Sequence, residues 1–315
     1  MNQSSFLSIA HKKKLKCEKF LNEMKKIIPW KRLIDLMANK YYGKTKVGRN
    51  KFDLEMMLKI YCLQQWYSLS DPGAEEVIYD RNSFQKFLGI DLIADNVPDE
   101  TTILNFRRFL EENNFQQKIF SEINKMLEEK GFLMKTGTIV DATIISAPSS
   151  TKNRDGKRDP EMSSTHKHGK WFFGIKAHIG VDVNDGLVHS LETSTAKVHD
   201  KKMEEKLYHG EEKARFGDSG YYDEKKKRCA RKSGIHWFIA DRGKRRHTLS
   251  SSQRKRNRKI ASIRGKVEYP FQVLKCQWNY TKIRYNGLAK NTLQLFMLFG
   301  LANLYRVRKK LILAT

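Results

Sequence analysis

The pattern of apolar residues changes abruptly after Gly131, and this change limits the chain to a helical part followed by a part that contains a sheet. Before Gly131, apolar residues recur at spacings of three and four, as between Phe115 and Leu127, which is typical of amphipathic helices. After it, residues 136–150 read TGTIVDATIISAPSS, and their Thr, Ile and Val content is typical of a buried strand. We therefore expect an all-helical domain over residues 1–132 and a second domain over residues 133–315.

Strand-like and helix-like segments are mixed in the second half, which predicts an α/β domain with a mixed five-stranded sheet flanked by helices. Asn184-Asp185-Gly186 has the chemistry of a hairpin turn, so the strands on either side of it are expected to pair. Residues 149–170 are polar and contain Gly and Pro, which predicts an exposed loop. The expected strands cover residues 136–150, 171–183, 187–195, 214–218 and 235–243, and the expected helices cover 199–212, 223–232 and the region from about 252 onward.

The chain carries a large excess of positive charge, with 61 Lys and Arg against 35 Asp and Glu and a formal net charge of +26. Lys and Arg side chains release condensed counterions when they contact a phosphate backbone, so nucleic acid is the favoured partner. A membrane surface is the competing partner, but the basic stretches are not paired with a strongly apolar helix face. We therefore expect a nucleic-acid partner and no membrane.

The four cysteines, Cys17, Cys62, Cys229 and Cys276, are far apart and form no C-x-x-C pair. This spacing suggests neither a zinc site nor a disulfide framework, and it favours a reducing compartment. The first residues lack the apolar core of a signal peptide, and no apolar run reaches the ~20 residues of a membrane span. We expect a soluble cytoplasmic protein of a bacterium or archaeon, associated with the nucleoid.

The end of the expected loop carries His166 and His168, followed by the aromatic run Trp171-Phe172-Phe173. Two histidines without a Cys partner are a weak metal site, so we do not assign them as ligands. The three aromatic residues are expected to pack against the sheet, and stacking on nucleic-acid bases is the lesser alternative.

Three carboxylates stand in unusual places. Asp141 interrupts an apolar strand, where an unpaired buried charge would be costly, and Asp218 ends a second strand. Glu268 follows eleven Lys or Arg and no acidic residue after Asp241, so its carboxylate should stay ionised. Each has an ordinary alternative: an edge-strand residue facing water, a turn or cap aspartate, and a surface ion pair, respectively. Carboxylates that converge from different elements suit Mg²⁺, which prefers oxygen ligands.

The surroundings of these three positions resemble the DDE transposases of bacterial insertion sequences, specifically the insertion-sequence-5 group. The matching stretches are VDATIISAPSS around Asp141, GDSGY around Asp218 and IRGKVEYPF around Glu268. The related family signature places a Tyr, an Arg, the catalytic Glu and a Lys at fixed spacing, and Arg264, Glu268 and Lys275 reproduce its last three members. Ala261 stands at the Tyr position, so any role of that residue is not carried over.

The resemblance, which covers most of the chain, implies a ribonuclease-H-like catalytic core that binds two Mg²⁺ or Mn²⁺ ions through Asp141, Asp218 and Glu268. Such an endonuclease would cut the terminal inverted repeats of a mobile element and join the freed 3′-hydroxyl to target DNA. Pro270 should kink or interrupt the helix that carries Glu268.

The partner implied by the resemblance is double-stranded DNA, bound by a homodimer that pairs two element ends. Arg264 and Lys275 are expected to hold phosphates near the scissile bond. Arg245 and Arg246, in the basic run from Arg242 to Lys259, are expected to contact the backbone, and a solvated basic face or a disordered loop is the alternative for this run. The helical domain over residues 1–132 is expected to bind the DNA ends, with Arg107 and Arg108 as candidate contacts. A simple helical packing or dimerisation domain remains the alternative.

Two other functions stay open at this stage. A protein of the same fold without catalysis would act as a DNA-binding repressor or architectural factor, although the presence of all three carboxylates favours an enzyme. A metal-dependent nuclease would cut DNA without joining it, and strand-transfer products distinguish it from a transposase.

Overall fold

The computed structural model describes residues 15–43, 51–152, 154, 156–167, 169–243 and 248–314. The chain forms two compact units, one made of Met1–Phe109 with Val307–Thr315 and the other of Leu110–Arg306. Helices α7 (Glu100–Glu112) and α12 (Leu288–Leu313) each contribute residues to both units. The division at residues 132 and 133, with an end-binding role for the first part, stays a prediction.

The first unit is helical and surrounds α4 (Leu54–Tyr67), in which eleven of fourteen residues are buried. Buried Lys59 is compensated by Glu55, whose carboxylate lies 2.7 Å from its ammonium group. The Asp53 side chain accepts from the Met56 amide and so caps the start of this helix. The other helices of the unit are α2 (Lys16–Ile27), α3 (Trp30–Tyr42), α5 (Asp71–Asp80), α6 (Asn82–Leu88) and the first part of α7.

The second unit contains a six-stranded mixed sheet in which β3 is paired along both edges. One edge of β3 pairs with β1, and both β2 and β4 pair with β3 as well, all three antiparallel. On the far side of β1, β5 and then β6 add as parallel strands. The strands are β1 (Gly137–Ser146), β2 (Ser163–Lys167), β3 (Lys170–Asp182), β4 (Val188–Thr195), β5 (Ala214–Gly217) and β6 (His236–Ile239).

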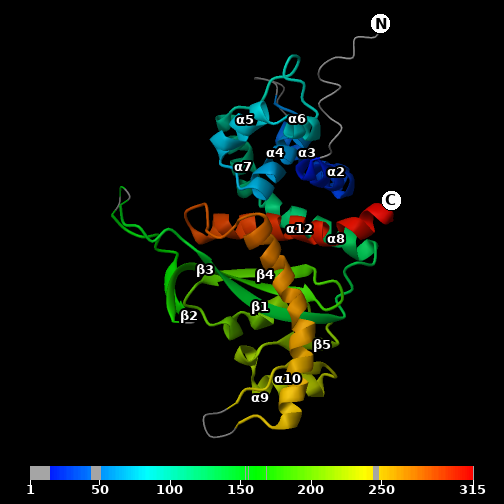
Figure 1. The fold of residues 1–315 in the computed structure, drawn as a ribbon, viewed down its shortest axis with the longest axis vertical. Coiled ribbons are helices and arrows are strands. Elements are labelled where there is room, and N and C mark those ends of the chain that lie inside the picture. Colours follow the sequence, from blue (N-terminus) through cyan, green and yellow to red (C-terminus); the bar gives the residue numbers. More distant parts are fainter. Residues whose placement is uncertain are drawn as a thin grey trace. The chain divides into compact units, whose positions relative to one another are not determined.

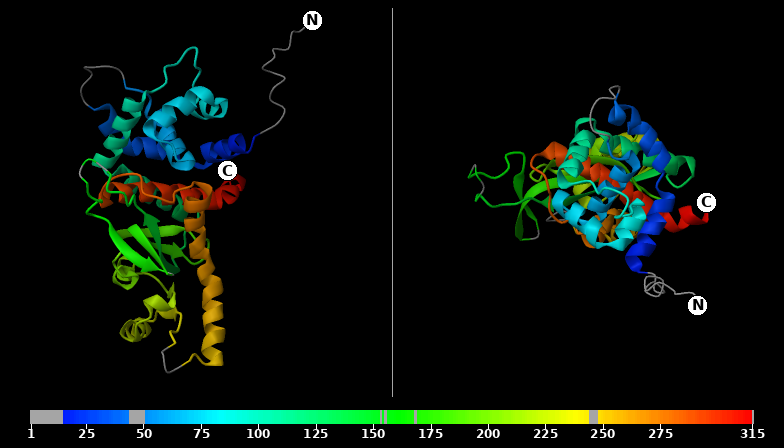
Figure 2. Two further views of the ribbon diagram at one scale, coloured as in Figure 1. Left: turned by 60° about the vertical axis from the view of Figure 1, so that its left-hand side comes forward. Right: turned by 90° about the horizontal axis from the view of Figure 1, so that it is seen from above.

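Helices cover both faces of this sheet. On one face lie α8 (Phe115–Glu129) and α12, which Figures 1 and 2 show running side by side. Buried Asn303 of α12 fixes this layer, because its side chain bonds the Val188 backbone and the amide oxygen of Asn124 on α8. The other face holds the 3₁₀ turns η1 (Asp200–Lys202), η2 (Glu204–Leu207) and η3 (Ser219–Tyr221) with α9 (Glu224–Lys232). At Gly180 of β3 a Cβ atom would lie 2.6 Å from the Leu207 carbonyl oxygen, so glycine permits the close approach of η2.

The helix that follows β6 is continuous but irregular. It comprises α10 (Ser251–Arg264), the 3₁₀ turn η4 (Gly265–Val267), α11 (Glu268–Gln272) and the π-helical turn η5 (Val273–Gln277). Pro270 has no amide proton to donate to the carbonyl four residues earlier, at Lys266, which lies in η4. The predicted disturbance of the Glu268 helix is therefore present as changes of helix type on both sides of α11.

The predicted fold class is confirmed: a helical N-terminal region precedes a ribonuclease-H-like mixed sheet flanked by helices. All five predicted strands are present, and β2 is a sixth strand that lies inside the predicted loop 149–170. The predicted helix over residues 199–212 is wrong, because η1 and η2 are short 3₁₀ turns followed by extended chain. Among the described helices, none is long and apolar enough to cross a membrane.

Candidate active site

Asp141 and Asp218 lie at matching places on two neighbouring strands. Strands β1 and β5 run parallel with Ile139 opposite Phe216, and each aspartate follows two residues later along its own strand direction. Asp218 directly follows β5, and its Oδ1 accepts from the Gly220 amide at 2.8 Å, which starts η3. The register alone therefore places the two carboxylates at the same end of adjacent strands.

Glu268 comes from the irregular helix rather than from the sheet. It is the first residue of α11, and the neighbouring Val267, Pro270 and Phe271 are buried. The buried side chains anchor α11 in the core, while Glu268 itself is exposed. A metal-binding carboxylate needs such a fixed supporting element.

The three carboxylates line one open pocket of about 490 Å³. Arg264 and Lys275, which stand at the signature spacing on either side of Glu268 in the sequence, line it as well. The pocket thus gathers five of the predicted site residues, whose catalytic and DNA-binding roles stay predictions. Its remaining lining residues are Ala142, Thr143, Lys167, Phe271, Gln272 and Cys276.

Burial raises the pKa of Asp141 to about 6. The Oδ1 atom of Asp141 accepts a hydrogen bond from the Ala142 amide at 2.8 Å, and the Arg264 guanidinium lies 3.4 Å from Oδ2. Both contacts stabilise the carboxylate and so act to lower its pKa. The negative charges of Glu268 and Asp218 act in the opposite direction. The three carboxylates are therefore close enough to repel one another, and a bound cation would relieve that repulsion.

Lys275 is held in the pocket by the sheet. Its Nζ donates to Thr143 Oγ1 at 2.6 Å and to the Ile144 carbonyl oxygen at 2.9 Å. Burial, followed by the charge of Lys167, lowers the pKa of Lys275. Three cations, Arg264, Lys275 and Lys167, thus line the pocket together with the carboxylates, an arrangement that suits a phosphodiester bound across it.

The donor set fits a hard divalent cation, because all three acidic side chains offer carboxylate oxygens and none offers sulfur or imidazole. In the described part of the chain, no three His, Cys, Asp or Glu side chains already stand in the arrangement of a metal site. One reason is visible at Asp141, where the Arg264 contact occupies one carboxylate oxygen. Metal binding would require this weak contact to give way.

The other predicted DNA contacts lie elsewhere. Arg245 and Arg246 fall outside the described residues. Arg107 belongs to α7 in the helical unit, where its guanidinium lies 2.9 Å from the Asp71 carboxylate and its side chain is 11% exposed. Arg107 therefore has a structural partner on α5, and its role as a DNA contact stays a prediction.

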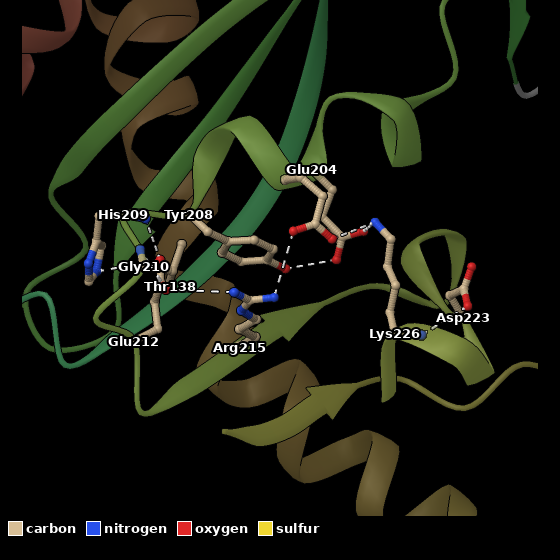
Figure 3. A network of polar contacts seen from close by, with 10 residues as sticks. Thr138, Glu204, Tyr208, His209, Gly210, Glu212, Arg215, Asp223 and Lys226 are labelled. Carbon is tan, nitrogen blue, oxygen red and sulfur yellow. Dashed lines mark hydrogen bonds and ion pairs between the residues drawn. The ribbon is translucent and has the colours of Figure 1, made fainter. Parts of the chain in front are cut away.

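On the face of the sheet that carries η2 and α9, a buried polar network connects these two elements to β5 (Figure 3). The fully buried Glu204 carboxylate accepts from the Tyr208 hydroxyl at 2.8 Å and from Lys226 Nζ at 2.6 Å. The Arg215 guanidinium of β5 lies 3.9 Å from the centre of the Tyr208 ring. Because Asp218 directly follows β5, this network holds the strand that presents it.

Sequence reasoning missed Lys167 and Thr143. Thr143 stands two residues after Asp141, so strand alternation alone places both on one face and was a usable signal. Lys167 belongs to β2, whose polar sequence gave no strand signal. Its place in the pocket follows only from the pairing of β2 with β3.

Comparison with known proteins places the chain in a family. A family model described as a transposase DDE domain matches residues 133–304, and a second, described as a transposase domain, matches residues 9–109. Among solved structures, a piggyBac transposase synaptic complex with hairpin DNA is similar at 10% identity and a TM-score of 0.47, covering 95% of this chain and 75% of that one. The Mos1 strand transfer complex is similar at 12% identity and a TM-score of 0.20, covering 81% and 87%.

Both structural likenesses are weak, and the assignment rests on the family models. The domain named in the first model cleaves and transfers DNA strands in a reaction that depends on a divalent metal ion. That model alone spans more than half of the 315 residues. The chain therefore belongs to the family of transposases with a DDE domain.

Proposed function

We propose that this transposase cuts the ends of a mobile DNA element and joins them to target DNA at a site formed by Asp141, Asp218 and Glu268. The observation that carries the proposal is the convergence of these carboxylates, from β1, the end of β5 and α11, on one pocket. Two Mg²⁺ or Mn²⁺ ions bound there would activate the attacking oxygen and stabilise the leaving oxygen.

The side chains of the pocket then have distinct tasks. The three carboxylates hold the metal ions, which also offsets their mutual repulsion. Lys275, oriented by Thr143 and Ile144, would bind a phosphate oxygen next to the scissile bond. Arg264 would exchange its contact with Asp141 for a second phosphate oxygen, because guanidinium binds phosphate well.

The basic surface of the second unit supports DNA as the partner. Helix α10 contains six Lys or Arg and no acidic residue, and only Ile260 of its fourteen residues is buried. Helix α9 contains six Lys or Arg among nine residues, of which Lys226 belongs to the buried network and Arg228 lies 3.7 Å from Glu224. Such exposed charge binds phosphate backbones whatever the base sequence, so these helices would track DNA beyond the pocket.

The remaining parts of the proposal follow from the reaction itself. Two element ends must be held together during transposition, which favours a homodimer on DNA. The helical residues 1–132 would recognise the terminal inverted repeats, and target DNA would enter the same pocket after cleavage. We propose a cytoplasmic, nucleoid-associated site of action, where such DNA is found.

The test compares Asp141→Ala with Glu211→Ala, a control that removes an exposed carboxylate of the same unit outside the pocket. The substrate is a duplex carrying the inverted repeat that borders the coding sequence. We expect Asp141→Ala to abolish Mg²⁺-dependent cleavage without much loss of DNA binding, and Glu211→Ala to retain both activities.

Cleavage by Asp141→Ala at the wild-type rate would refute the proposed site. A wild-type protein that binds this duplex but never cuts it would instead be a DNA-binding protein without catalysis. Strand-transfer products from a pre-cut repeat separate a transposase from a nuclease that cuts but does not join.

A further inference from the structure

Trp171 is the exception among the five tryptophans of the chain. Trp66, Trp237 and Trp278 are 3%, 6% and 4% exposed and Trp30 is half-buried, whereas Trp171 is 75% exposed. The sequence-based prediction that Trp171 packs against the sheet is therefore wrong. Tryptophan is enriched at interfaces, where its apolar ring is covered by a partner, so an exposed Trp171 indicates a binding surface.

Trp171 lies near the tip of the hairpin formed by β2 and β3. In this hairpin His166 pairs with Trp171, and Lys167 pairs with Lys170. The His166 and Trp171 rings lie 5.3 Å apart, so they form an aromatic pair on one face of the hairpin. Because side chains alternate along a strand, Lys167 and Lys170 belong to the opposite face.

The hairpin is also part of the active-site rim. Lys167 lines the same pocket as Asp141 and Lys275, and it stands next to His166 in β2. His166 and Trp171 are thus each one residue away, along their own strand, from the pair formed by the pocket residue Lys167 and Lys170. Residues 163–174, over which β2 and β3 pair, contain no Asp or Glu, so this part of the hairpin carries only positive or neutral side chains.

We propose that the β2–β3 hairpin stacks Trp171 on an unpaired base of the DNA strand whose phosphate lies in the pocket. This inference rests on the proposed function and adds to it a second contact, to a base rather than to phosphate. Lys167, on the face of the hairpin that lines the pocket, binds the strand there. Trp171, supported by His166 on the opposite face near the tip, takes an unpaired base of the same strand where that strand passes the tip.

An unpaired base is the occupant that the chemistry selects. The flat face of an indole stacks on the face of a base, and in a paired duplex that face is covered by neighbouring base pairs. A second copy of the chain is a poorer occupant, because its formal net charge of +26 would meet a surface without acidic residues. A single strand combines an aromatic face with a negative backbone, which matches both faces of the hairpin.

The experiment measures binding without divalent ions, so that no cleavage is needed. The probes are a synthetic duplex of mixed sequence with a short unpaired bubble and the fully paired duplex of the same sequence. The variants are Trp171→Ala, Trp171→Phe and the control Met134→Ala, which shortens another exposed apolar side chain (55% exposed) in the same unit. The part of the tryptophan fluorescence quenching by the bubble that is lost in Trp171→Ala reports stacking on Trp171, because the chain has four other tryptophans.

We expect Trp171→Ala to weaken binding of the bubble duplex roughly 5- to 150-fold, the range found for one base on an aromatic side chain. Its binding of the paired duplex should change little, Trp171→Phe should keep most of the bubble preference, and Met134→Ala should behave as wild type. Equal binding of the bubble by wild type and Trp171→Ala would overturn the proposal.

Two further outcomes distinguish base stacking by Trp171 from a protein interface and from the proposed catalysis. If Trp171→Ala alters self-association in sedimentation while the bubble preference is unchanged, Trp171 belongs to a protein interface and the proposal is wrong. If the bubble preference depends on Trp171 but the wild type never cleaves its inverted repeat, the stacking surface stands and the proposed catalysis fails. The two proposals are thus tested separately.

Discussion

Glu204 and Glu205 are adjacent residues that both contact Lys226, but one carboxylate is buried and the other is exposed. Lys226 Nζ lies 2.6 Å from the Glu204 carboxylate (Figure 3). It lies 3.0 Å from the Glu205 carboxylate. The Glu204 side chain is fully buried, whereas that of Glu205 is 57% exposed. Replacing each with Ala therefore compares a buried with an exposed ion pair to a common partner.

The expected cost of Glu204→Ala follows from the contacts that it removes. The substitution removes two hydrogen bonds to a charged group, from Tyr208 and Lys226, each worth ~1.5–3 kcal/mol. The two losses are not additive, and Lys226 keeps Glu205 and is 24% exposed, so its charge is not left stranded. We expect the free energy of unfolding to fall by about 3 kcal/mol, at the lower end of the range for a broken buried pair.

The assay is thermal unfolding of the full chain by circular dichroism. For a unit of about 200 residues, such a loss lowers the melting temperature by roughly 6–12 °C. Glu205→Ala removes an exposed carboxylate that lies 3.0 Å from Lys226 and 3.8 Å from Arg215. These two exposed contacts together are worth about 1 kcal/mol at most, so the variant should lower the melting temperature by no more than about 4 °C. Equal melting temperatures for the two variants would refute the view that the buried network holds η2, α9 and β5 together.

Three further predictions concern other parts of the second unit. Lys275→Met should slow DNA cleavage roughly 100-fold under single-turnover conditions, whereas Lys275→Arg keeps the charge and should lose less; full activity of the Met variant would exclude a phosphate contact. Burial lowers the pKa of His178 from 6.5 to about 4. Between these two pH values, His178 is therefore protonated in the unfolded chain and neutral in the folded chain. Stability should therefore fall as pH drops from about 6.5 to about 4, by ~3 kcal/mol for this residue, and His178→Gln should lessen that slope in denaturant titrations. Asn303→Ala leaves the buried Val188 amide without its acceptor and should cost ~1–3 kcal/mol in the same titrations, so an unchanged midpoint would contradict the described layer.

The strands that build the site were predictable because their local sequence agrees with their surroundings. Strand β1 is rich in β-branched residues and is buried over its first half, so its composition reveals it. Strand β2 is polar and largely exposed, and it exists because it pairs with β3 rather than because of its own residues. No single-sequence pattern carries that information.

The wrong helix over residues 199–212 has a tertiary cause. The spacing of apolar and polar residues in this segment favours a helix. However, the buried carboxylates of Glu204 and Glu212 form hydrogen bonds that a helix over residues 199–212 would not provide. Lys226 of α9 holds the former, and the backbone amides of His209 and Gly210 donate to the latter. Gly210 also has a φ of 93°, which a helix does not contain.

The site residues likewise fall into those that the sequence located and those that only the fold places there. Asp141, Asp218 and Glu268 were found from strand positions and motif resemblance, and the structure brings them to one pocket. Lys167 joins them only through pairing of β2 with β3, and the exposure of Trp171 depends on where the hairpin leaves the sheet. Local patterns thus locate the acidic residues, whereas the surrounding cations and aromatic surface require the fold.

The proposed metal site is tested most directly by the position of Mn²⁺ in crystals of the complex with inverted-repeat DNA, located by anomalous scattering. Two ions should lie ~3.5–4 Å apart in the pocket. Each should lie within bonding distance of Asp141, Asp218 or Glu268 oxygens, with all three carboxylates used between them. Manganese bound elsewhere on the chain, or a pocket in which Glu268 or either aspartate contacts no ion, would contradict it.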